Sequence, residues 1–177
     1  SYQSFLYIDK DILATSLRKT RLCAISTVPD ALELLVTALR RKFVSTVLLG
    51  NVGQSEALLK SMQEPEDGYE FIDEPVGAKA AHLACKMVAD GKADMPMKGQ
   101  MATADFMRAI LDKQYGFIPG NGLLCQATVL EWAEKKRLMI ITDCAVNIAP
   151  DYAAKKKILE NAVKLAHQLG IECPKVA

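Results

Sequence analysis

The segment from Lys98 to Arg108 carries the residues best suited to binding an anion. Lys98-Gly99 follows a short apolar stretch, and Thr103 stands where a helical pattern begins. The first N–H groups of a helix have no partners inside the helix and carry partial positive charge, so they attract a phosphate or a carboxylate. The guanidinium of Arg108 would add bidentate donors, and Gly99 allows close backbone approach. This segment is therefore a candidate anion site, although the local pattern by itself favours a simpler interpretation, a capped helix with two surface cations.

A second candidate is the pair Asp143-Cys144, which ends an apolar run. Asp143 could act as a base or orient a cation or a donor, and Cys144 could act as a nucleophile. No histidine stands nearby in the sequence to activate the thiol. The local pattern favours a simpler interpretation, in which Asp143 accepts turn hydrogen bonds and Cys144 is a small buried residue.

Composition argues against several classes of protein. The chain has 22 Lys and Arg against 21 Asp and Glu, so charge gives no case for a nucleic-acid or membrane-surface partner. The 5 cysteines are widely spaced without a C-x-x-C motif, and neither His82 nor His167 has metal-spaced companions. No apolar run approaches the ~18 residues that span a bilayer. We expect no metal, and a reducing compartment.

Short apolar runs alternate with helical patterns from residue 21 onward. Leucines and a valine repeat at helical spacing after Pro29, and Gly91 suits the position just after a helix. The expected strands are 21–27, 44–49, 69–73 and 93–97, and the expected helices are 29–42, 55–62, 77–89 and 103–114. Pro96 makes the fourth strand irregular or an edge strand. The alternation predicts an α/β fold with a largely parallel sheet, flanked by helices in three layers.

A cluster of chain breakers marks the expected boundary between two domains. It consists of Gly116, Pro119, Gly120 and Gly122. Residues 1–117 would form an N-terminal α/β domain, with a short helix or an arm over residues 1–20. Residues 118–177 would begin a second, incomplete α/β domain.

That second domain should open with a β-hairpin, because apolar runs at 123–132 and 137–144 flank a short polar segment. A long helix is expected over residues 151–169, with Gly170 as its end. Residues 174–177 resemble the start of a further β-strand. We therefore expect the chain to be an N-terminal fragment.

Two stretches together resemble the phosphate acetyl/butyryltransferase family. From Gly91 the chain reads GKADMPMKGQMATADFMRAILDKQYG, and from Thr142 it reads TDCAVNIAPDYAAKKKILENAVKLAHQLGIECPKVA. The MKG loop and the TDCAVNIAP turn are closer to the butyryl branch. The resemblance extends over nearly the whole chain from residue 21 and is strongest in these two stretches.

The resemblance implies an acyltransferase that interconverts acyl-CoA plus phosphate with acyl phosphate plus CoA. Such enzymes are cytoplasmic homodimers with two α/β domains and a site in the cleft between them. They need no metal or prosthetic group, and coenzyme A enters as a substrate. In that chemistry the CoA thiol, deprotonated by a base, attacks the carbonyl carbon of the acyl phosphate.

The family's functional positions can be matched to this chain. Lys98 and Gly99 match its Lys-Gly loop. Thr103 and Arg108 match the residues at the phosphate end of the cleft, and Arg108 would stabilise charge on the leaving phosphate. Asp143 and Cys144 match the strand-end pair that lines the cleft. The resemblance thus implies catalytic roles for Arg108 and Asp143, and substrate contacts for the others.

The chain also departs from the family pattern. It has Cys125-Gln126 where the family commonly has Ser-His, and the family's Ser-Arg motif and catalytic carboxylate belong to a later stretch. We therefore expect this fragment to be inactive alone. A non-catalytic phosphate- or CoA-binding α/β module is an open alternative. A metal-dependent β-decarboxylating dehydrogenase is another, although only Asp143 is suitably placed for its metal.

Overall fold

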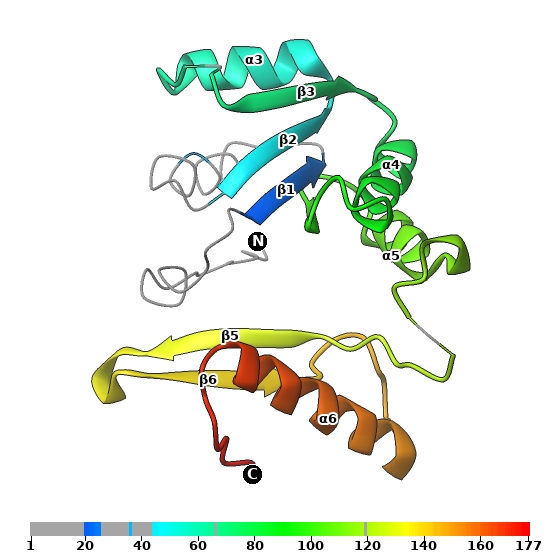
Figure 1. Ribbon diagram of the computed structural model, residues 1–177, viewed down its shortest axis with the longest axis vertical. Helices are drawn as coiled ribbons and strands as arrows, with labels where there is room; N and C mark the ends of the chain where they lie inside the picture. Colours follow the sequence, from blue (N-terminus) through cyan, green and yellow to red (C-terminus); the bar gives the residue numbers. More distant parts are fainter. Residues whose placement is uncertain (1–19, 26–35, 37–43, 66, 119) are drawn as a thin grey trace. The chain divides into compact units, whose positions relative to one another are not determined.

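The computed structural model describes residues 20–25, 36, 44–65, 67–118 and 120–177 (Figure 1). The chain divides into two compact units, one formed by residues 16–117 and the other containing residues 118–177. The arm expected over residues 1–20 and the helix expected over 29–42 fall almost entirely outside the described residues. Within the described part of the chain, no helix has the length and apolar character needed to cross a membrane.

The first unit contains a parallel sheet of four strands. They are β1 (Thr20–Ile25), β2 (Val44–Gly50), β3 (Tyr69–Asp73) and β4 (Met95–Lys98), in the order β3-β2-β1-β4. Every pairing in this sheet is parallel, which confirms the predicted largely parallel sheet. Strand β4 lies at an edge, as Pro96 required, because proline has no N–H to donate on one side.

Alternate side chains of the central strands enter two separate cores. Cys23 and Ile25 of β1 pack with α4 (Gly77–Ala89), whereas Leu22 and Ala24 pack with the buried Leu59 of α3 (Val52–Ser61). This period-two alternation with apolar residues on both sides is typical of a sheet covered on both faces. The fold is therefore the predicted three-layer α/β arrangement.

Helix α3 begins earlier than expected. The side chain of Asn51 accepts a hydrogen bond from the Gln54 N–H at 3.0 Å and so caps the helix. Ser55, the cap that the sequence suggested, is a buried residue inside the helix. The prediction missed Asn51 because Gly50-Asn51-Val52-Gly53 reads as a turn, and asparagine suits both a turn and a cap.

Helix α5 (Thr103–Leu111) differs from its expected form at both ends. Ala102 is the capping residue and makes no side-chain cap bond, so Thr103 is the first helical residue rather than the cap. At the other end Asp112 takes an extended backbone and accepts the Gln114 N–H at 3.0 Å. That contact starts a short 3-10 helix, η1 (Lys113–Tyr115), where a longer α-helix was expected.

The second unit contains the predicted hairpin and helix. Strands β5 (Ala127–Trp132) and β6 (Arg137–Thr142) pair antiparallel and are joined by the 3-10 helix η2 (Ala133–Lys135). Helix α6 (Tyr152–Gln168) follows, and the Asp151 side chain caps it by accepting the Ala154 N–H at 2.8 Å. Residues 174–177 form no strand.

The core on β2 gives a test of this packing. Leu49 is 1% exposed, and its truncation in Leu49→Ala leaves a cavity between β2 and α4. We expect a loss of about 2–5 kcal/mol in the free energy of unfolding, measured by urea denaturation. The same substitution at Leu111, which is 52% exposed, should cost less than about 0.5 kcal/mol. Equal effects would contradict the burial described here.

Candidate functional site

The Lys98-Gly99 loop lies at the topological switch point of the sheet. The chain leaves β1 for β2 and β3 on one side and returns to β4 on the other side of β1. In open parallel sheets, ligands bind at the carboxyl ends of the two strands where this reversal occurs. Lys98 is the last residue of β4, and the N–H of Gly99 donates to the Ile25 carbonyl at the end of β1, at 2.8 Å. The predicted anion loop therefore sits where this fold binds ligands.

Two helices begin beside this loop. A Cβ atom on Gly77, the first residue of α4, would lie 3.4 Å from the Cβ of Met101 in the loop before α5. Within the described residues, neither Val76 nor Ala102 supplies a side-chain cap to these helices. The two helix starts thus bring uncapped backbone donors and partial positive charge to one corner of the unit.

The loop residues themselves are accessible. Lys98 is half-buried, and its Nζ donates to the Gly99 carbonyl at 3.3 Å. Thr103 is exposed at the start of α5. An ammonium, a glycine and an exposed hydroxyl therefore stand within one short loop. This arrangement suits a phosphate, and the assignment of these residues to substrate binding stays a prediction.

Arg108 does not join that loop within this unit. It lies in the last turn of α5, its guanidinium pairs with the Asp105 carboxylate, and its side chain is 71% exposed. Five residues separate it from Thr103, which is a rotation of roughly 140° around a helix with 3.6 residues per turn. The expected cradle of Thr103 and Arg108 is therefore not formed by this unit alone, and the catalytic role of Arg108 remains a prediction.

In the second unit, the Asp143 carboxylate organises the turn after β6. It accepts hydrogen bonds from the N–H groups of Ala145 at 3.1 Å and Val146 at 3.0 Å, and from the Asn147 side chain at 2.5 Å. The Gln126 backbone also hydrogen-bonds to this carboxylate. The turn interpretation of the sequence is thus realised, with more donors than the local pattern indicated.

These donors set the acidity of Asp143. Burial of the side chain raises its pKa, but the hydrogen bonds from Val146, Asn147 and Ala145 outweigh burial and lower the pKa to about 2. A carboxylate of that pKa is a weak proton acceptor near neutral pH. The hydrogen bonds show that Asp143 organises the turn, and its catalytic role stays a prediction. Cys144 is exposed with a free thiol, so the interpretation of a buried cysteine is wrong.

Side chains, not a sheet, hold the segment that precedes β5. Its backbone carbonyls accept hydrogen bonds from the turn and from α6, a feature that the sequence analysis missed because the donors lie far along the chain. The pairs are Lys157 with Asn121, Asn161 with Leu123 at 3.2 Å, Asn147 with Leu124 at 2.9 Å, and Thr142 with Gln126 at 2.5 Å. Residues 121–126 are therefore fixed beside the Asp143 turn.

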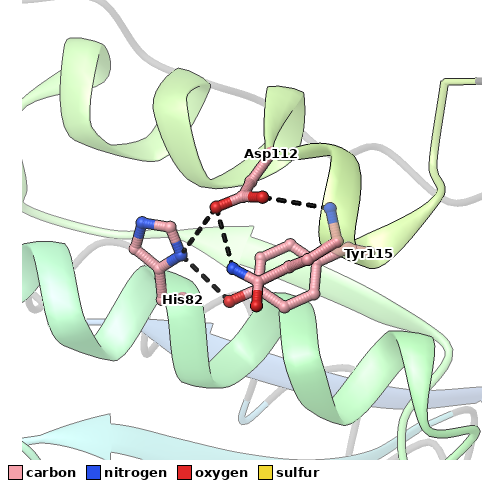
Figure 2. Close-up of polar contacts among 4 residues, drawn as sticks. His82, Asp112 and Tyr115 are labelled. Atoms are coloured by element: carbon pink, nitrogen blue, oxygen red, sulfur yellow. Dashed lines mark hydrogen bonds and ion pairs between the residues drawn. The ribbon is translucent and has the colours of Figure 1, made fainter.

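A separate polar cluster lies between α4 and η1 (Figure 2). His82 Nδ1 lies 2.9 Å from the Tyr115 hydroxyl and 3.9 Å from the Asp112 carboxylate. Gln114 donates to the same carboxylate through its N–H at 3.0 Å and its Nε2 at 2.8 Å. Among the described residues, no three His, Cys, Asp or Glu side chains could hold a metal. The cluster joins η1 to α4, and we assign it no chemistry.

Replacement of Asp143 tests its structural role. Its folded pKa of about 2 lies below the ordinary 3.8, so the carboxylate stabilises the fold above pH 4 and loses that effect as the pH falls towards 2. Asp143→Asn should lower the free energy of unfolding by up to about 2 kcal/mol at pH 7. The deficit should shrink between pH 4 and 2 in urea melts at stepped pH.

Glu134→Gln, on the exposed η2 turn of the same unit, is the control and should follow the wild-type pH profile. A constant deficit for Asp143→Asn at every pH would show that its charge is not what stabilises the turn.

Known proteins of one family match the chain. The family model described as phosphate acetyl/butaryl transferase matches residues 62–177, which include both the Lys98 loop and the Asp143 turn. Phosphate butyryltransferase of Clostridium acetobutylicum is 33% identical over 99% of this chain and 58% of that protein. Phosphate acetyltransferase of Thermotoga maritima is 30% identical over 82% of this chain and 49% of that protein.

Solved structures show the same likeness. A branched-chain phosphotransacylase from Enterococcus faecalis matches with a TM-score of 0.70 and 25% identity, over 89% of this chain and 54% of that one. A phosphotransacetylase from Streptococcus pyogenes shares the fold with a TM-score of 0.73 at 16% identity, over 93% of this chain and 60% of that one. The chain spans about half the length of the relatives that it matches. It belongs to the phosphate acetyl/butaryl transferase family.

Proposed function

We propose that the chain is part of an acyltransferase that interconverts acyl-CoA plus phosphate with acyl phosphate plus CoA. The observation that carries this proposal is the position of the Lys98-Gly99 loop. It lies at the switch point of a parallel sheet, beside two uncapped helix starts, within the region that matches the family. The activity of the whole protein is proposed because the chain spans 58% of its butyryltransferase relative.

In the proposed reaction, the loop binds the phosphate. The Lys98 ammonium and the Thr103 hydroxyl provide donors for charge that develops as phosphate leaves the acyl group, and Gly99 lets the phosphate approach the backbone closely. Arg108 joins them in the complete active site, after exchanging Asp105 for the more highly charged phosphate. Asp143 and Cys144 line the part of the cleft that receives CoA.

The remaining parts of the proposal follow from the family. The protein uses coenzyme A as a substrate, needs no permanently bound cofactor, works in the cytoplasm and forms a homodimer. The two units, divided at 117 and 118, are its N-terminal domain and the start of a second domain. With a pKa of about 2, Asp143 would be a weak base for the CoA thiol.

A non-catalytic module that binds phosphate or CoA is the second candidate. The ion pair of Arg108 with Asp105 favours it, because a guanidinium already neutralised by its own helix contributes little to transition-state charge. Ligand binding without turnover would be its signature.

Thermal denaturation with added ligands tests the function. Coenzyme A and inorganic phosphate should each raise the Tm of this chain, since a ligand that binds only the folded state stabilises it. NAD should not, because the loop lacks a dinucleotide fingerprint. Stabilisation by NAD alone would favour the dehydrogenase alternative. We expect no CoA-dependent turnover of acyl phosphate by this chain alone, and measured turnover would refute that expectation.

Variants of the loop test the phosphate site. In the whole protein, Lys98→Met and Arg108→Ala should each weaken phosphate binding about tenfold, measured by calorimetric titration, because each removes one charged donor. Lys113→Ala removes an exposed cation from η1 and should leave the affinity unchanged. If Arg108→Ala behaves like the control while Lys98→Met does not, Arg108 takes no part in binding.

A further inference from the structure

Gln126 is held from both sides at the open end of the hairpin. Its carbonyl accepts the Thr142 hydroxyl at 2.5 Å, and its backbone hydrogen-bonds to the Asp143 carboxylate. Ala127 pairs with Thr142 across the two strands, so Gln126 and Asp143 are neighbours just beyond the last strand pair. The residue is therefore fixed next to the turn that carries the exposed Cys144.

The side chain of Gln126 has an unused hydrogen-bonding end. Its Nε2 lies 3.4 Å from the Thr128 hydroxyl, whereas its Oε1 is buried and has no hydrogen-bond partner among the described residues. In the flipped amide, Oε1 and Nε2 exchange places. Oε1 would then pair with the Thr128 hydroxyl, and Nε2 would have no partner. In both orientations one end of a buried amide is unpaired. Folding disfavours such a group, so it calls for a partner that the described residues do not supply.

The chemistry of the proposed substrates points to one ligand. Phosphate and acyl phosphate offer mainly acceptor oxygens, which can pair with this amide only when its nitrogen is the unpaired end. The pantetheine arm of coenzyme A carries amide groups, each with one N–H and one C=O, so it can complete a carboxamide in either orientation. We propose that the side chain of Gln126 binds an amide of the pantetheine arm, an inference that rests on the proposed function.

The test compares two ligands and two variants by calorimetric titration. Coenzyme A carries the pantetheine arm, and 3′-phospho-ADP lacks it. Gln126→Met keeps the length of the side chain and removes its hydrogen bonds, so its Kd for coenzyme A should rise about tenfold while its Kd for 3′-phospho-ADP stays unchanged. Gln168→Met, at the exposed end of α6, should match the wild type with both ligands.

Thermal denaturation separates this role from a structural one. Because one end of the Gln126 amide is unpaired, Gln126→Met should keep or raise the Tm without ligand. A lower Tm, or an equal loss of affinity for both ligands, would show that Gln126 supports the fold and would overturn the inference. Unchanged affinity for coenzyme A would also overturn it and leave the proposed function intact. Failure of the wild type to bind coenzyme A would instead overturn the proposed function.

Discussion

The carboxylate of Asp143 is the contact on which the candidate site of the second unit depends. It draws together the N–H groups of the turn after β6, the Asn147 side chain and the backbone of Gln126. Asn147 in turn holds the carbonyl of Leu124. One charged group thus joins a turn to a segment that no sheet supports. A carboxylate accepts hydrogen bonds more strongly when it is ionised, and the low pKa of Asp143 keeps it ionised at neutral pH.

The central strand β1 plays the corresponding part in the first unit. Its side chains enter both cores. Its neighbours β2 and β4 lie on opposite sides of it, because the strand order runs outwards from β1 to β3 on one side and then continues with β4 on the other. The same reversal places Lys98 and Gly99 at the carboxyl ends of neighbouring strands, where open parallel sheets bind ligands. The packing of the sheet and the position of the loop therefore share one topological cause.

The two units divide the proposed chemistry. The first offers an ammonium and two uncapped helix starts, which suit phosphate. The second carries the exposed thiol of Cys144 and the unpaired Oε1 of Gln126, the residue that we propose binds the arm of coenzyme A. This division agrees with a chain that belongs to a family of such transferases while spanning about half the length of its relatives.

The sequence alone determined the α/β class, most of the described elements and the Lys98 loop, because apolar periodicity, Gly, Pro and local motifs are short-range signals. It placed the ends of α3 and α5 less well. Asn51 suits a turn as well as a cap, and α5 begins after Ala102, which makes no side-chain cap bond. Only the tertiary structure decided which distant groups meet. The pairing of Asn161 with Leu123 spans 38 residues, and that of His82 with Tyr115 spans 33. Such contacts, and the pKa that follows for Asp143, depend on packing that no local pattern encodes.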